Sequence, residues 1–104
     1  MTPRGFCRKI AWIGHCTEGT SDKIWGFLDF EGTTYTFWGR RTGPWTFKNL
    51  GAERWRAEGA RDIKRFDHGY REINPCSLYP GFAAELQTGF AKACLTNRFH
   101  GEGG

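Results

Sequence analysis

The sequence predicts an α+β fold: a small antiparallel β-sheet with one helix packed on a face and an added C-terminal helix. Three observations predict it. Residues 23–30 and 33–40 are rich in aromatic and β-branched side chains and are separated only by a Glu-Gly pair, which indicates a β-hairpin. The apolar spacing then changes from two residues to three or four over 52–66, which indicates a helix. A second helical pattern covers 81–95.

The hairpin is expected to lie in a sheet with shorter strands. Residues 6–13 alternate in a strand-like way and predict a first strand, and 15–22 predict a polar loop after it. Beyond the hairpin, 45–48 and 70–73 predict two short strands. Because neighbouring side chains of a strand point to opposite faces, Trp25 and the residues beside it are expected on different faces, with Trp25 mostly buried.

The helix over 52–66 is expected to pack its apolar side against the sheet. Its apolar positions, three or four residues apart, are Ala52, Trp55, Gly59, Ile63 and Phe66. Trp55 should therefore be buried. Asn49 is the expected N-cap, and Gly69 is the expected residue just past the helix end.

The C-terminal helix is expected to begin after Pro80. Its apolar positions in register are Phe82, Leu86, Phe90 and Ala93. Residues 1–95 are expected to form a single domain, because the chain has only 104 residues and no long linker. The tail over 96–104 is expected to be disordered.

Composition narrows the class of protein. There is no run of about 20 apolar residues, so no membrane span is expected, and the N-terminus lacks the apolar segment of a signal peptide. Four cysteines without a C-x-x-C pair indicate free thiols in a reducing compartment, the cytoplasm. Their irregular spacing relative to the histidines predicts no metal site, and no cofactor-binding motif is present.

No catalytic constellation can be assembled from the residues. The three histidines are scattered, and neither a phosphate-binding loop nor a dinucleotide-binding motif is present. The sequence therefore predicts a non-catalytic binding module rather than an enzyme.

The positive charge is local. Residues 40–72 contain nine Lys and Arg against five Asp and Glu, an excess of +4 that equals the net charge of the whole chain. The cations of this segment are Arg40, Arg41, Lys48, Arg54, Arg56, Arg61, Lys64, Arg65 and Arg71. Those at 54, 61 and 65 are expected together on the outward side of the helix. A local basic face favours a polyanionic partner, although a solvated helix surface gives the same pattern.

The segment 37–45 holds two tryptophans, two adjacent arginines and a Gly-Pro turn. Trp38 and Arg40 are two residues apart on the predicted strand, so both are expected on one side of the sheet, near the strand end. A guanidinium pairs with phosphate in a fork, and an indole offers a flat face to a sugar or a base. Trp38 could equally be one of several tryptophans that fill the core.

These residues resemble a known family. Trp38-Gly39-Arg40, the Trp-Gly-Phe segment at 25–27 and the Gly-Tyr at 69–70 resemble the WGR domain, which is named for this tripeptide and is known from DNA-damage-activated poly(ADP-ribose) polymerases and from small bacterial proteins. The resemblance covers 22–73. The family continues past the tripeptide with a small apolar residue and a Gly-rich turn, whereas this chain has Arg-Thr-Gly-Pro-Trp at 41–45.

The resemblance implies a stand-alone DNA-binding module in which Trp38 packs near the sugar at a DNA end. It gives Arg40 a role in contacting DNA or a neighbouring domain. On charge grounds we add phosphate contacts from Arg41, Lys48, Arg54, Arg61 and Arg65. The bound nucleic acid is expected to be DNA rather than RNA. The alternative is a small protein-interaction module, such as a phage or mobile-element inhibitor or adaptor acting on a host protein.

Overall fold

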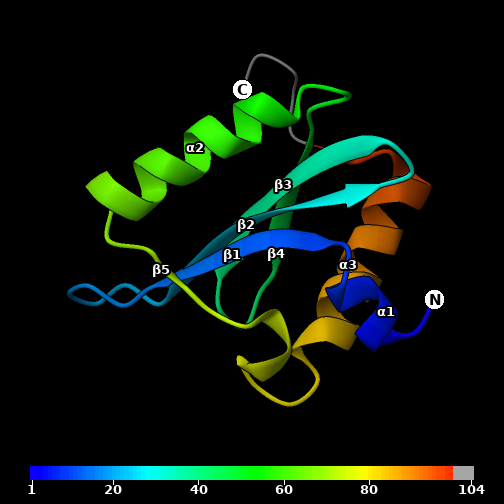
Figure 1. The fold of residues 1–104 in the computed structure, drawn as a ribbon. Coiled ribbons are helices and arrows are strands. Elements are labelled where there is room, and N and C mark those ends of the chain that lie inside the picture. Colours follow the sequence, from blue (N-terminus) through cyan, green and yellow to red (C-terminus); the bar gives the residue numbers. More distant parts are fainter. Residues whose placement is uncertain (100–104) are drawn as a thin grey trace.

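The computed structural model describes residues 1–99, which fold as one antiparallel sheet with helices on both faces (Figure 1). The helices are α1 (Pro3–Cys7), α2 (Arg54–Asp67) and α3 (Phe82–Thr96), with a short 3₁₀ turn, η1, at Pro75–Ser77. The strands are β1 (Ile10–Cys16), β2 (Lys23–Phe30), β3 (Thr33–Arg40), β4 (Trp45–Asn49) and β5 (Arg71–Glu72). The predicted α+β class is confirmed.

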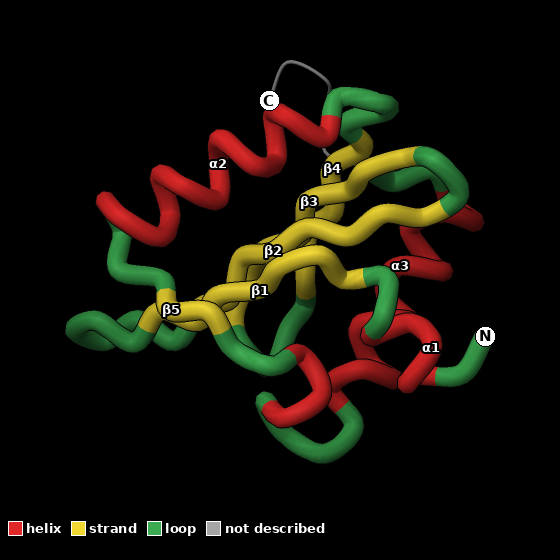
Figure 2. The backbone as a smooth tube through the Cα atoms, viewed as in Figure 1, coloured by secondary structure: helices red, strands yellow, loops and turns green. Residues whose placement is uncertain are grey.

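The sheet has the strand order β4-β3-β2-β1-β5, and each neighbouring pair is antiparallel (Figure 2). The predicted hairpin is its centre. The turn at Glu31 and Gly32, both with positive φ, sets a register in which Phe30 pairs with Thr33 and Lys23 pairs with Arg40. The predicted short strands at 45–48 and 70–73 are present as β4 and β5.

One face of the sheet is covered by α3 and α1. The buried residues of this first core include Ile24, Leu28 and Phe37 from the sheet and Phe82, Leu86, Phe90 and Ala93 from α3. The apolar register predicted for the C-terminal helix is therefore confirmed. Its Phe90 ring contacts Phe6, Phe30, Tyr35 and Phe47.

The other face of the sheet packs against α2. Its core consists of Trp12, Cys16, Trp25, Phe27, Leu50, Ala57 and Tyr70. The predicted burial of Trp25 is confirmed, because it is 5% exposed. Large aromatic side chains from the strands fill most of this layer, and α2 approaches them with the small side chains of Ala57 and Ala60.

The predicted orientation of α2 is wrong. Trp55 is 67% exposed, Ile63 52% and Phe66 73%, so the apolar side of the helix faces solvent. The sheet-facing side carries Ala57, which is completely buried. The aromatic side chains of the sheet leave room for alanine there and not for a second layer of tryptophan and phenylalanine.

The N-terminal prediction is also wrong in part. Residues 3–7 form α1 rather than a strand, because the Thr2 hydroxyl accepts a hydrogen bond from the Gly5 N–H and Pro3 occupies the first turn. The strand begins at Ile10 and runs through His15 and Cys16, which were expected in the loop.

The predicted cap at the start of α2 is likewise wrong. Asn49 does not cap the helix: the N-cap is Glu53, without a side-chain bond, and the Asn49 side chain accepts from the Gly51 N–H instead. Gly69, with φ of 73°, follows the helix as predicted.

The tail does not become irregular at residue 96. Thr96 ends α3, and the Phe99 ring lies 5.4 Å from that of Tyr35. The rest of the predicted disordered segment, residues 100–104, lies outside the described residues.

Candidate functional site

A cavity of about 450 Å³ lies between α2 and the β2-β3-β4 part of the sheet. Its lining residues are Lys23, Ile24, Trp25, Thr36, Trp38, Gly39, Lys48, Leu50, Arg56, Ala60, Lys64 and Tyr70. We call this cavity the Trp38 pocket. Its volume is in the range of sites that take a small molecule or one residue of a polymer.

The aromatic wall of the Trp38 pocket comes from the central hairpin and from the chain after α2. Trp25 and Trp38 are cross-strand partners, so their side chains stand on the same face of the sheet. Trp25 is buried, whereas Trp38 is half-buried. Tyr70 completes the wall, and burial, followed by the nearby Cys16, raises the pKa of its phenol. Tyr70 therefore stays neutral at physiological pH and adds no negative charge.

All the charged residues that line the Trp38 pocket are cations. Lys23 and Lys48 come from the strands, and Arg56 and Lys64 come from α2, about two helical turns apart. The Lys64 ammonium lies 5.5 Å from the centre of the Tyr70 ring, and the Arg56 guanidinium donates to the Glu53 carboxylate at 3.0 Å. An anion that carries a ring or a sugar would meet both positive charge and a flat indole here.

The end of β3 is fixed by a tight turn. Gly39 has φ of 151°, and a Cβ atom at this position would lie 2.6 Å from the carbonyl oxygen of Pro44. The Arg40 carbonyl accepts two bonds, from the Gly43 N–H at 2.9 Å and from the Trp45 indole N–H at 2.8 Å. These bonds close the turn that follows β3, two residues beyond Trp38.

The structure brings only two of the predicted site residues into the Trp38 pocket, Trp38 itself and Lys48. Arg40 is exposed and stands opposite Lys23 in the register of β2 and β3, so it lies next to the pocket without lining it. The prediction that Trp38 and Arg40 stand near the end of a strand is confirmed.

Arg41 has a structural position. Its Nε donates to both oxygens of Asp22, at 3.2 and 3.1 Å, and its guanidinium lies 5.7 Å from the centre of the Tyr79 ring. The Asp22 carboxylate also bonds to the His15 ring nitrogen at 2.7 Å. This bond to His15 and, to a lesser extent, Arg41 hold the pKa of Asp22 below its ordinary value. Arg41 thus ties the end of β3 to the β1–β2 loop.

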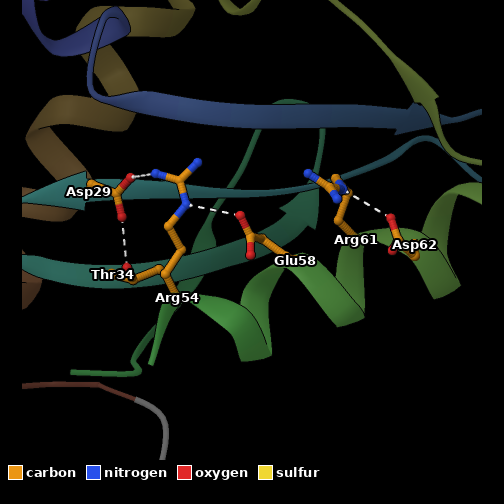
Figure 3. A network of polar contacts seen from close by, with 6 residues as sticks. All are labelled: Asp29, Thr34, Arg54, Glu58, Arg61 and Asp62. Carbon is orange, nitrogen blue, oxygen red and sulfur yellow. Dashed lines mark hydrogen bonds and ion pairs between the residues drawn. The ribbon is translucent and has the colours of Figure 1, made fainter. Parts of the chain in front are cut away.

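The prediction that Arg54, Arg61 and Arg65 lie together on the outward side of α2 is correct only in part: Arg54 and Arg65 are exposed, but Arg54 lies against the sheet. Figure 3 shows Arg54 between Asp29 and Glu58, and its guanidinium stands over the Phe27 ring. Arg61 bonds to Asp62 at 3.1 Å in the same view. Arg65 is exposed and lies over the ring of Phe66. Arg54 and Arg61 are therefore engaged in ion pairs with their neighbours.

Sequence reasoning missed Lys23, Arg56 and Lys64 as pocket residues. The hairpin turn at Glu31-Gly32 already places Lys23 opposite Arg40, so this residue could have been found from register alone. Arg56 and Lys64 are eight residues apart and share a helix face, but the side of α2 that meets the sheet was mispredicted.

Other chemistry finds little support in the part of the chain from 1 to 99. No group of three His, Cys, Asp or Glu side chains there could hold a metal ion. Burial, followed by a hydrogen bond to Cys76, raises the pKa of the Cys7 thiol to about 12, so this thiol is protonated at neutral pH and is a poor nucleophile. None of the helices in this range is long and apolar enough to cross a membrane.

Comparisons of the chain with protein-family models, with curated proteins and with solved structures find no match.

Proposed function

We propose that this protein is a non-catalytic module that binds nucleic acid through the Trp38 pocket and prefers DNA to RNA. The observation that carries the proposal is the lining of the pocket: four cations and a half-buried indole line it, and the one acidic side chain that the structure places on these cations, Glu53 on Arg56, is not among the lining residues. The WGR resemblance of residues 22–73 supports the same site, because Trp38 belongs to the tripeptide that defines that family.

In this proposal phosphates lie against the cations and one sugar or base lies against Trp38. Lys23 and Lys48 reach the pocket from the sheet, and Lys64 reaches it from the opposite side. Stacking on an aromatic side chain contributes about 1–3 kcal/mol per base and is tolerant of sequence. A cavity of about 450 Å³ takes one nucleotide unit rather than a duplex, which favours a strand end or a single strand.

Binding is tested by fluorescence anisotropy with single-stranded DNA, blunt duplex DNA, 5′-phosphorylated duplex DNA and RNA, each at two salt concentrations. We expect the tightest binding to DNA with an accessible end and a clear loss of affinity at the higher salt. No binding to any of the four at about 50 mM salt would contradict the proposal.

A double variant, Lys23→Ala with Lys48→Ala, tests the site itself. Removing two phosphate contacts should reduce the slope of log affinity against log salt by about 2. The matched control is Lys9→Ala, which removes an exposed lysine outside the pocket and should leave the slope unchanged. Melting curves of all variants show whether the fold is kept.

The alternative of a protein-interaction module would use a different surface, the solvent-facing side of α2 with its exposed Trp55 and Phe66. Failure of every nucleic acid to bind would favour this alternative.

A further inference from the structure

Two of the four cysteines, Cys7 and Cys76, lie together although they are far apart in the sequence. Cys7 is buried at the end of α1, and Cys76 is exposed in the short turn η1. These two elements are in contact, and a hydrogen bond joins the two thiols. We call them the Cys7–Cys76 pair. A pair with one exposed and one buried thiol has a chemistry that neither cysteine has alone.

The packing of α1 holds Cys7 in place. The Thr2 hydroxyl accepts from the Gly5 N–H at 3.0 Å, and the Thr2 carbonyl accepts from the Phe6 N–H at 2.9 Å. Phe6, the neighbour of Cys7, is 1% exposed, and its ring lies 5.8 Å from that of Phe90 in α3. The helix is therefore anchored in the first core, and the Cys7 thiol is largely closed to reagents in solution.

A network of local bonds holds Cys76. The Asn74 side chain accepts from the Cys76 N–H at 2.9 Å, and the Asn74 carbonyl accepts from the N–H and the hydroxyl of Ser77, both at 3.0 Å. Pro75 begins the turn with a fixed φ. The turn thus presents the Cys76 thiol to solvent and to Cys7 at the same time.

We propose that the Cys7–Cys76 pair is a site of reversible oxidation, at which Cys76 reacts with a peroxide and then forms a disulfide with Cys7. In the first step the Cys76 thiolate attacks hydrogen peroxide: the O–O bond breaks, the sulfur is oxidised to a sulfenic acid, and the peroxide is reduced to hydroxide, which takes up a proton to give water. In the second step the Cys7 sulfur displaces the sulfenic hydroxyl group, which leaves as water with the Cys7 proton, and the S–S bond forms. A small-molecule thiol restores both cysteines by thiol–disulfide exchange and is itself oxidised to its disulfide.

The surroundings of the two thiols assign these roles. Oxidation at cysteine follows exposure and thiolate character, and only Cys76 of the pair is exposed. Burial, followed by the hydrogen bond to Cys76, raises the pKa of the Cys7 thiol to about 12, so Cys7 stays protonated at neutral pH and does not react with peroxide itself. It has to react only with the sulfur beside it, and such proximity accelerates an intramolecular step strongly.

Mass spectrometry of the full chain tests the pair. The reduced protein is treated with a small excess of hydrogen peroxide near neutral pH. We expect the four free thiols to fall to two, the mass of the chain to fall by two hydrogen atoms, and peptide mapping to find Cys7 linked to Cys76. Dithiothreitol should then restore all four thiols.

Cys7→Ser separates the two steps. Cys76 should still be oxidised in this variant, but its sulfenic acid then lacks a partner, so dimedone should label it about tenfold more than in wild type. Cys76→Ser should leave Cys7 as a free thiol under the same conditions. The matched control is Cys94→Ser, which removes the other exposed cysteine and should leave the link between Cys7 and Cys76 unchanged.

The disulfide should also stabilise the fold, because it joins α1 to η1 and closes a loop of about 70 residues in the unfolded chain. The midpoint of thermal unfolding should be about 5 °C or more higher in the oxidised than in the reduced wild type, and this difference should be absent in Cys76→Ser. An unchanged midpoint in the linked protein would contradict the contact of α1 with η1 on which the proposal depends.

Three further outcomes would overturn the proposal: all four thiols stay free after peroxide, the bond that forms joins other cysteines or two chains, or Cys7→Ser does not increase the labelling of Cys76. None of these measurements contains nucleic acid, so they succeed or fail independently of the proposed function.

Discussion

Gly39 and Asp22 show how single residues hold the strand ends beside the Trp38 pocket. Gly39 has a backbone conformation that side chains rarely adopt, and the Pro44 carbonyl occupies the space where its Cβ would lie. Asp22 connects the β1–β2 loop to the end of β3 through His15 and Arg41. Both residues fix the chain close to Trp38, so both bear on the shape of the pocket.

Gly39→Ala should destabilise the protein by about 1–3 kcal/mol or more, because backbone strain adds to the clash with Pro44. Urea unfolding measures this change. Gly32→Ala is the matched control: it also has positive φ, 80°, but none of the described atoms lies within 4 Å of its added Cβ, so it should cost less. Equal losses in the two variants would show that the approach of Pro44 is unimportant.

Asp22→Asn should change how stability depends on pH. The pKa of Asp22 is lowered in the folded protein, which means that folding favours the charged carboxylate. Its contribution to the free energy of unfolding is therefore fully present above the ordinary pKa of about 3.9. That contribution is lost as the pH falls through the lower pKa of the folded state. Wild type should therefore be more stable than Asp22→Asn near neutral pH, and the difference should vanish in strong acid. Urea midpoints across this range measure it, with Glu31→Gln, which removes an exposed carboxylate elsewhere, as the control. A constant difference at all pH values would argue against the His15–Asp22–Arg41 contacts.

The two long helices contribute to the fold in different ways. α3 buries four apolar side chains in the first core, whereas α2 buries Ala57 completely and leaves its largest side chains in solvent. The stability of the monomer should therefore depend on the apolar residues of α3 and much less on those of α2.

Trp55→Ala should change the free energy of unfolding by no more than about 0.5 kcal/mol, as for other surface positions. Leu86→Ala, at a fully buried position of α3, should cost about 2–5 kcal/mol. Both are measured by denaturant unfolding. A large loss in Trp55→Ala would mean that α2 turns its apolar side toward the sheet.

In the molecule as a whole, the excess of positive charge comes from one segment of the chain. The segment 40–72 carries the entire excess of +4 and includes α2, which covers one face of the sheet, while α1 and α3 cover the other (Figure 1). A local field of this kind acts on a polyanion through the face that carries it.

The salt dependence of DNA binding should therefore follow local charge rather than net charge. With four to six phosphate contacts the slope of log affinity against log salt is expected to be about −3 to −5. Replacing Arg4, Arg8 and Lys9 by Gln removes three exposed cations at and just after α1 and lowers the net charge from +4 to +1. Because none of the three lines the Trp38 pocket, the slope should stay the same. A slope that flattens in this triple variant would show that binding responds to the overall charge.

Local patterns in the sequence were enough to predict the central hairpin and the C-terminal helix. The Glu-Gly turn and its aromatic flanks specify the hairpin and hence which residues stand opposite one another, including Trp25 and Trp38. The spacing of Phe82, Leu86, Phe90 and Ala93 specifies the buried side of α3. Trp38 could be named as a candidate site residue from the Trp-Gly-Arg tripeptide, and Lys48 could be named from its charge.

The side that α2 turns toward the sheet, and the cations that share the pocket with Trp38, depend on contacts between segments far apart in the chain. Periodicity identifies an apolar side of a helix but not the surface that it meets. Here the strands supply Trp12, Trp25 and Phe27 to the second core, and that layer has room for Ala57 but not for Trp55. The same packing turns Arg56 and Lys64 toward the Trp38 pocket and leaves Trp55, Ile63 and Phe66 in solvent.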